Sequence, residues 1–151
     1  MSSGERLGKE GQIIVSGLDP DRIARHLSSE ATPMKDMLLR DRDTKEVVRR
    51  IPRWEIALSD RLSGDQTSIV IEPENKRVVI SIEGKGGRNS FHFNDVGDVE
   101  YSKTGGEVTF VRETEEIRYQ IGVNSSGRVQ SVFREEKEYA DDGLIVDTRD
   151  L

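Results

Sequence analysis

Residues 84–88 combine backbone freedom with positive charge. Three glycines and two cations make up the run Gly84-Lys85-Gly86-Gly87-Arg88. Glycine adopts the positive φ angles that direct backbone N–H groups toward one point, and ammonium and guanidinium groups donate strong hydrogen bonds to phosphate oxygens. A solvent-exposed hairpin turn would have the same composition. The stretch therefore indicates either an anion site or an ordinary turn.

A second group of cations lies upstream, at Arg49, Arg50 and Arg53. If the fold places it near Lys85 and Arg88, the combined positive potential would attract an anion more strongly. Nucleic acid is a poor candidate, because no aromatic residues for base stacking are interleaved with these arginines. The formal net charge of −6 also opposes indiscriminate binding to nucleic acid or to an anionic membrane.

The two histidines do not form a recognisable catalytic or metal-binding pair. His26 falls on a predicted helix, where no partner for a ligand or a base is recognisable. His92 alternates with Phe91 and Phe93, so in a strand it points away from the apolar face. We therefore expect an ordinary surface histidine at position 26 and a cross-strand contact at position 92.

Other signatures of catalysis are missing from the sequence. Without cysteine, the chain cannot form disulfides, thiolate metal sites or cysteine nucleophiles. A nucleophile elbow, a P-loop and a dinucleotide-binding glycine motif are also missing. The carboxylate pairs Glu135-Glu136 and Asp141-Asp142 are sequence neighbours, so their side chains diverge on regular structure. We predict that the protein is not an enzyme and uses neither a metal nor a cofactor.

Size and composition favour one soluble domain. The 151 residues are 33% hydrophobic and 34% charged, and the chain has no run of about 18 apolar residues that would predict a membrane span. The N-terminal sequence MSSGERLGKEGQ lacks the apolar core of a signal peptide. Together with the missing cysteines, this predicts a cytoplasmic protein without a transmembrane segment.

Charge is distributed unevenly along the chain. Residues 35–61 contain eight basic and six acidic residues, whereas residues 135–151 contain two basic and seven acidic residues. A solvated surface produces such differences by chance. Otherwise the acidic tail, residues 141–151, folds back on the basic segment or serves as a docking strip.

The clearest structural signal is a β-hairpin between residues 67 and 82. β-Branched runs at 68–71 and 77–82 flank the break Pro73-Glu74-Asn75-Lys76. Such runs form strands, and a break of this length forms a four- or five-residue turn between them. We therefore place the start of an antiparallel sheet here.

Shorter alternating segments follow the hairpin and extend the predicted sheet over residues 67–133. They lie at 90–93, 98–101, 107–111 and 117–123. Residues 128–140 fit either a last strand or a terminal helix. The residues that we assign to the apolar core face are Ile69, Ile71, Val78, Ile80, Ile117, Tyr119 and Ile121.

Residues 19–63 are predicted to be mainly helical. Asp19 followed by Pro20 is a strong helix start, since aspartate caps the N-terminus and proline fits the first turn. Thr32-Pro33 repeats this signal. The rest of the segment is less clear, because two further stretches fit two structures each.

The first ambiguous stretch, residues 34–51, fits helices or a hairpin that joins 37–39 to 46–48. The second, residues 53–63, fits one face of a helix as well as a strict strand alternation. We favour the helix there. In either structure Trp54, the only tryptophan, is expected to anchor the core.

The second half of the chain shows a repeated apolar spacing. The residues that carry it are Ile69, Ile71, Arg77, Val78 and Ile80, then Phe91, Phe93, Asp95, Val96 and Val99. From residue 69 to about 139, this spacing resembles that of bacterial pleckstrin-homology-like domains. The resemblance implies a small bent antiparallel sheet with a closing helix, used to bind lipids, peptides or proteins and not for catalysis.

These observations predict one α+β domain over residues 11–140. Its antiparallel β-meander, a bent sheet or small open barrel, follows the mainly helical segment 19–63, while residues 1–10 are disordered and the acidic tail ends the chain. Open sheet edges favour a protein-interaction or assembly module that binds a protein partner or a second copy by strand pairing. The alternative is an anion or phosphorylated-headgroup binding module that uses residues 84–88.

Overall fold

The computed structural model describes residues 5–8, 11–139 and 145–147. This part of the chain consists mostly of antiparallel strands and has one α-helix. The elements in chain order are β1 (Arg6–Leu7), β2 (Ile13–Ser16), α1 (Pro20–His26), β3 (Ala31–Pro33), β4 (Met37–Arg40), β5 (Val47–Ile51), β6 (Trp54–Ser59), β7 (Gln66–Glu72), the 3₁₀ turn η2 (Pro73–Asn75), β8 (Arg77–Gly84), β9 (Gly87–Phe93), β10 (Asp98–Tyr101), β11 (Glu107–Glu113), β12 (Ile117–Asn124), β13 (Val129–Tyr139) and β14 (Ile145–Asp147).

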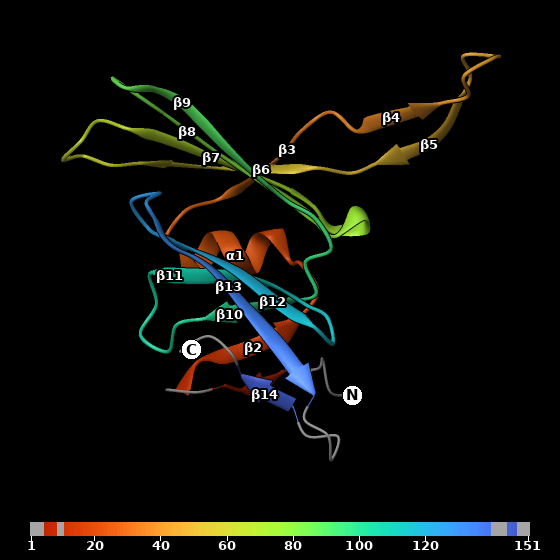
Figure 1. Cartoon of the computed structure of the whole chain (residues 1–151). Helices are drawn as coiled ribbons and strands as arrows, with labels where there is room; N and C mark the ends of the chain where they lie inside the picture. Colours follow the sequence, from red (N-terminus) through yellow and green to blue (C-terminus); the bar gives the residue numbers. More distant parts are fainter. Residues whose placement is uncertain (1–4, 9–10, 140–144, 148–151) are drawn as a thin grey trace.

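Two sheets form the body of the molecule (Figure 1). The larger has the strand order β1-β2-β10-β11-β12-β13-β14, and the smaller has the order β3-β6-β7-β8-β9. A third sheet contains only β4 and β5, and it extends away from the body at the upper right of Figure 1. We call this hairpin, Met37–Ile51, the arm.

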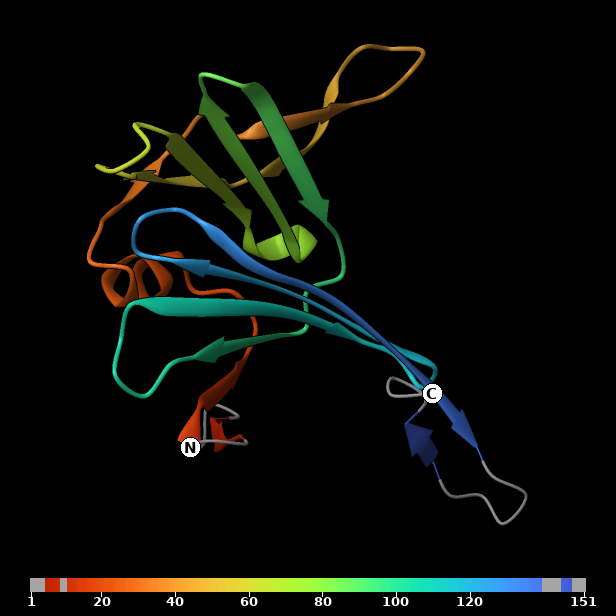
Figure 2. The same cartoon turned by 60° about the vertical axis from the view of Figure 1, so that its left-hand side comes forward.

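The core lies between the two larger sheets, and α1 closes one side of it. The helix packs against β3 and β6 of the five-stranded sheet and against β11 of the seven-stranded sheet. In Figure 2 it fills the space between the sheets on the left. The main buried residues are Ile23 and Leu27 from α1, Ile56, Ile69, Ile71, Val78 and Ile80 from the smaller sheet, and Val99, Tyr101, Val108, Phe110, Ile121 and Val123 from the larger.

The predicted α+β fold with a mainly helical segment at 19–63 is wrong. The capping signal at Asp19-Pro20 does start a helix, and the Asp19 carboxylate accepts hydrogen bonds from two backbone N–H groups of the first turn at 3.1 and 3.3 Å. However, α1 ends at His26, and Ser28 adopts a positive φ of 57°. The rest of the segment forms β3 to β6.

The stretch at 34–51 adopts its hairpin alternative. An Asx turn forms at the tip of the arm, where the Asp41 carboxylate accepts hydrogen bonds from the backbone N–H groups of Asp43 and Thr44 at 2.9 Å. These are the N–H groups that a helix would direct along its axis at an N-terminus. The aspartate therefore satisfies them in a turn and lets the chain reverse into β5.

The stretch at 53–63 also forms a strand, and the predicted helix there is wrong. β6 pairs with β7 along its whole length, which buries Ile56 and Leu58 on one face of the sheet. The segment forms a strand because its side chains on both faces of the sheet have cross-strand neighbours on β7. Trp54 is half-buried and lies outside the core cluster, so it is not the predicted core anchor.

The predicted hairpin at 67–82 is confirmed. β7 and β8 pair in the register Ile69↔Ile80 and Ile71↔Val78, and η2 forms the turn. The predicted single sheet over 67–133 is wrong, because the chain leaves the smaller sheet after β9 and continues in the larger sheet at β10. Residues 129–139 form the strand β13 and not a helix.

The predicted core face is only partly buried. Ile69, Ile71, Val78 and Ile80 are inaccessible to solvent and Ile121 is nearly so. In contrast, Ile117 and Tyr119 are half-buried. They belong to the N-terminal half of β12, the end that extends beyond the smaller sheet in Figure 2.

The N-terminal segment differs from its predicted disorder where it is described, and part of the acidic tail forms a strand. Arg6 and Leu7 pair with β2, and the Arg6 guanidinium contacts the Asp98 carboxylate at 2.9 Å. Residues 145–147 of the acidic tail form β14 on β13. Residues 1–4, 9–10, 140–144 and 148–151 lie outside the described part of the chain. Within that part, no helix combines the length and apolar character needed to cross a bilayer.

Candidate interaction surfaces

The glycine-rich stretch forms a tight hairpin turn between β8 and β9. Gly84 pairs with Gly87, so only Lys85 and Gly86 lie in the turn itself. Gly87 has a φ of 112°, which explains the need for glycine there. The paired ends leave a two-residue turn, which is shorter than the five-residue loop 84–88 on which the anion alternative is based.

Carboxylates lie close to this turn. Gly84 has no room for a Cβ because the Asp65 carboxylate, from the loop between β6 and β7, lies against it. Glu83 is the cross-strand partner of Arg88. An anion at Lys85 and Arg88 would therefore meet negative as well as positive charge.

The structure does not bring the two predicted basic groups together. Arg53 precedes Trp54, which is level with Val78 of β8, because Trp54 pairs with Ile71 and Ile71 pairs with Val78. Arg88 instead pairs with Glu83, near the other end of β8. These rungs are five residues apart along β8, or about 17 Å at strand spacing.

The arginines near the arm have local partners. Arg53 donates hydrogen bonds to the Lys35 carbonyl from Nε and Nη2 at 3.1 and 2.9 Å. Arg49 lies 3.7 Å from the Glu74 carboxylate, whereas Arg50 is exposed on β5. Arg49 and Arg53 thus attach the base of the arm and do not extend an anion site.

The histidines form structural contacts. The His26 ring lies 3.0 Å from the Ser102 hydroxyl and edge-on to Tyr101, with ring centroids 5.1 Å apart. Burial lowers the pKa of His26 from its usual value, while the contact with Ser102 opposes the shift. His92 is exposed and lies 3.0 Å from Arg77, the cross-strand type of contact that we expected.

A cleft of about 550 Å³ opens beside the turn between β12 and β13. It is lined by Asp60, Asp65 and Ser63 from the β6–β7 loop and by Arg128 and Gln130. The Arg128 guanidinium contacts Asp60 and lowers the pKa of that carboxyl to about 2, assisted by backbone N–H groups. Sequence reasoning missed this pair, since 68 residues separate its members.

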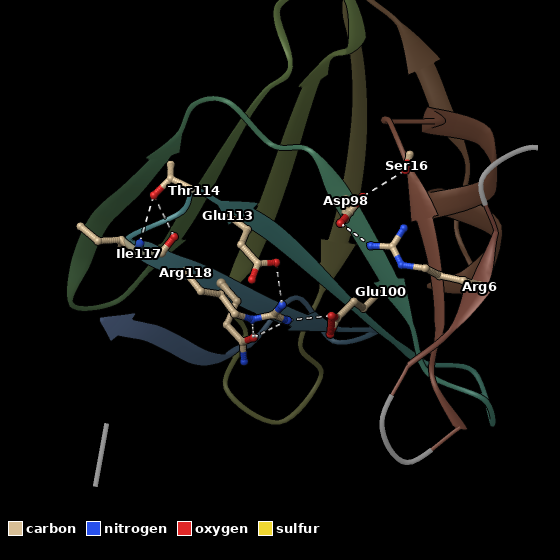
Figure 3. A network of polar contacts seen from close by, with 9 residues as sticks. Arg6, Ser16, Asp98, Glu100, Glu113, Thr114, Ile117 and Arg118 are labelled. Atoms are coloured by element: carbon tan, nitrogen blue, oxygen red, sulfur yellow. Dashed lines mark hydrogen bonds and ion pairs between the residues drawn. The ribbon is translucent and has the colours of Figure 1, made fainter. Parts of the chain in front are cut away.

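Ion pairs also connect strands across the outer face of the larger sheet (Figure 3). Arg118 on β12 contacts Glu100 on β10 at 2.8 Å and Glu113 on β11 at 3.5 Å. Asp98 on β10 joins Arg6 and the Ser16 hydroxyl. These contacts pair side chains within one sheet, so their effect is to align its strands.

The arm exposes apolar side chains. Leu38 is 38% exposed, Leu39 41% and Val48 65%. Both edges of this two-stranded sheet are open in the described part of the chain, because β4 and β5 pair only with each other. An unpaired backbone edge next to apolar side chains is a surface that favours strand addition.

No metal centre is visible in the described residues, which contain no group of three His, Asp or Glu side chains that could hold an ion. The resemblance to pleckstrin-homology-like domains stays a prediction. No protein-family model, no curated protein and no solved structure matches this chain.

Proposed function

We propose that this protein is a non-catalytic interaction or assembly module that binds a protein partner or a second copy of itself. It does so through open sheet edges and exposed apolar side chains. The observation that supports the proposal is the arm, which projects from the body and keeps three large apolar side chains in solvent.

An isolated arm is costly for a monomer. Two-stranded hairpins are marginally stable in water, and apolar side chains in solvent contribute nothing to their stability. Leu38 and Leu39 are consecutive in β4 and point to opposite faces of the arm, so a partner on either face gains apolar burial, and a strand that pairs with β4 or β5 gains backbone hydrogen bonds. The arm thus provides both the contact energy and the directionality of an assembly contact.

Light scattering coupled to size-exclusion chromatography tests this function. We expect wild type to show a mass above the 17.0 kDa of one chain, increasing with concentration. The double variant Leu39→Asp/Val48→Asp should weaken self-association at least about tenfold, because it places charge at the apolar contact.

Leu62 provides the matched control. Among the described residues it is the most exposed large apolar residue, at 91%, but it lies in the β6–β7 loop outside the arm. Leu62→Asp should leave the mass unchanged. A wild-type chain that stays monomeric up to about 1 mM would exclude self-assembly through the arm. Equal effects of the arm and loop variants would show that the arm is not the contact.

A further inference from the structure

The two strands of the arm differ in how well their edges are protected. The pairing register skips one residue of β5, Val48, which leaves a bulge there. β5 also carries Arg49 and Arg50, and Pro52 follows it. Bulges, charges and proline all discourage further pairing at a sheet edge. β4, Met37–Arg40, has no bulge and no proline, and in the described part of the chain it pairs only with β5. Its outer edge can therefore accept another strand.

The sequence around β4 is complementary to itself when it is read in the opposite direction. The stretch is Lys35-Asp36-Met37-Leu38-Leu39-Arg40-Asp41, with Leu38 at its centre. At equal distances from the centre, the residues are Lys35 and Asp41, Asp36 and Arg40, and Met37 and Leu39. Each charge is thus matched by the opposite charge, and each apolar residue by an apolar one. Two identical strands that pair antiparallel about a two-fold axis at Leu38 would place these residues directly opposite one another.

Neighbouring registers lose this match. A slip by one residue in one direction places Asp36 opposite Asp41 of the partner subunit, and a slip in the other direction places Lys35 opposite Arg40 of the partner subunit. A slip by two residues places Leu38 opposite a charged residue in either direction. Like charges directly opposite destabilise a strand pair, whereas opposite charges stabilise it. The charges around β4 therefore select the register that is centred on Leu38.

The charged side chains of this stretch are available for such pairing. They are exposed, and within the described part of the chain none of them forms an ion pair. The Arg40 guanidinium donates a hydrogen bond to the Lys45 carbonyl at 2.8 Å and keeps further N–H donors. The backbone N–H groups at the tip of the arm bond to one oxygen of the Asp41 carboxylate, which keeps acceptor capacity.

The apolar side chains of β4 would be covered on both faces of the arm. Leu38 points to one face, where it would meet Leu38 of the partner subunit. Met37 and Leu39 point to the other face, where Met37 of each copy would meet Leu39 of the other. In the single chain, Leu38 is 38% exposed and Leu39 41%. Pairing of β4 with β4 therefore buries exposed apolar surface while it adds backbone hydrogen bonds.

We propose that two copies of this protein associate through antiparallel pairing of their β4 strands, with the two-fold axis at Leu38. The two arms then form one four-stranded sheet in the order β5-β4-β4-β5. Because each arm projects from its body, the two bodies lie at opposite ends of this sheet (Figure 1). Each copy uses the same edge, so assembly stops at two chains. The inference rests on the proposed function and deepens it, because it names a second copy as the partner and assigns the contact to one strand.

Charge reversal tests the register. In Asp36→Arg alone, and in Arg40→Asp alone, like charges oppose each other at two places in the dimer. Each variant should therefore self-associate at least about tenfold more weakly than wild type. An equimolar mixture of the two should recover association, because each copy then places the opposite charge across from its partner. Light scattering coupled to size-exclusion chromatography measures both effects, and the wild-type mass should level off at two chains.

Arg42 provides the matched control for this exchange. It is exposed at the tip of the arm, and in the proposed register it does not lie opposite residue 36. The double variant Asp36→Arg/Arg40→Asp should associate like wild type. The double variant Asp36→Arg/Arg42→Asp has the same net charge and should stay as weak as Asp36→Arg. Recovery in the Arg42 variant in place of the Arg40 variant would assign the axis to Leu39 and overturn the proposed register.

Cross-linking at the axis gives a second measurement that leaves the charges unchanged. The chain has no cysteine, so an introduced one reports on its own position. Opposed residues of an antiparallel pair have Cα atoms about 4.5–5.5 Å apart, within the reach of a disulfide. Leu38→Cys should therefore give a covalent dimer on mild oxidation, visible by denaturing electrophoresis without reductant. Leu39→Cys should cross-link less, because it faces Met37, and the loop variant Leu62→Cys should stay monomeric.

The outcomes separate this inference from the proposed function. Recovery in the mixture together with a Leu38→Cys dimer would support it. Association that Leu39→Asp/Val48→Asp weakens, but that the mixture does not recover, would overturn the β4 pairing and leave the arm as the contact. A mass that rises beyond two chains would overturn the closed dimer, and equal cross-linking of Leu38→Cys and Leu62→Cys would overturn the axis. A wild-type chain that stays monomeric up to about 1 mM would overturn the inference and leave only a different protein as the partner of the arm.

Discussion

Two hairpins of this protein have the same antiparallel pairing and opposite environments. β7–β8 pairs through seven rungs and buries Ile69, Ile71, Val78 and Ile80 completely. The arm pairs through four rungs, and the side chains of its strands remain mostly exposed. Backbone pairing by itself therefore does not distinguish a core hairpin from a projecting one. The difference is whether another layer of the protein covers one face.

The largest expected effect follows from this difference in burial. Ile80→Ala should reduce the free energy of unfolding by about 2–5 kcal/mol, because it removes a fully buried side chain and leaves a cavity. Val48→Ala on the arm should change it by less than about 0.5 kcal/mol. Urea denaturation of both variants checks the comparison. Equal losses would mean that the arm packs against the body in solution.

A smaller effect is expected where the core hairpin meets the turn between β12 and β13. Gly127 has a φ of 81°, and a Cβ there would collide with Thr67 of β7, whose hydroxyl donates a hydrogen bond to the Gly127 carbonyl at 2.8 Å. Gly127→Ala should cost about 1–3 kcal/mol. Gly105→Ala is the control, since its φ of 86° is similar but its surroundings are open.

Thermal denaturation of the two glycine variants separates backbone strain from the steric contact. Both variants carry the strain, but only Gly127→Ala also pushes β7 away from the larger sheet. The difference between their melting temperatures therefore measures how tightly the core hairpin is held. Identical melting temperatures would contradict close contact between Gly127 and Thr67.

Acid should affect two loops to different extents: the β6–β7 loop, which contains Asp60, and the tip of the arm, which contains Asp41. Arg128 holds the pKa of Asp60 at about 2, whereas the backbone N–H groups of Thr44 and Asp43 lower the pKa of Asp41 in the arm. A carboxyl whose pKa is lower in the folded state stabilises the fold at pH values above its unfolded-state pKa, which is near 3.8 for Asp60. This stability is lost as the pH falls through the folded-state pKa. For Asp60 this window lies between about pH 4 and pH 2.

Urea midpoints measured from pH 5 to pH 2 test this prediction. Asp60→Asn should flatten the loss of stability with acid, because a titrating carboxyl that bridges two sheets is gone. Asp41→Asn should flatten it less, since its hydrogen bonds stay within the arm. A larger effect at Asp41 would mean that the arm contributes more to global stability than its exposure indicates.

The smallest expected effect on folding concerns the glycine-rich turn. Lys85 and Arg88 are exposed, so Lys85→Ala/Arg88→Ala should leave the urea midpoint nearly unchanged. The same double variant tests the anion alternative, because each lost charge-assisted hydrogen bond would weaken anion binding by about 1.5–3 kcal/mol. Titration of wild type with inositol phosphates checks it. Saturable shifts confined to residues 84–89 and lost in the variant would favour that alternative.

The sequence by itself determined the features that depend on near neighbours. Asp19-Pro20 starts α1, and the break at 73–76 joins two β-branched runs into the hairpin β7–β8. In both cases the signal is local, since a cap or a turn needs only a few adjacent residues with the right side chains and backbone angles. Such signals do not depend on which other parts of the chain lie nearby.

Only the tertiary structure decided the front half and the candidate surfaces. Residues 34–63 fit two periodicities. Pairing with β7 makes β6 a strand, and within residues 19–63 only α1 is an α-helix. The Asp60–Arg128 pair and the cleft that it lines join residues that are distant in sequence. A periodic pattern shows which side chains share a face, but burial and charge pairing depend on what the rest of the chain places against that face.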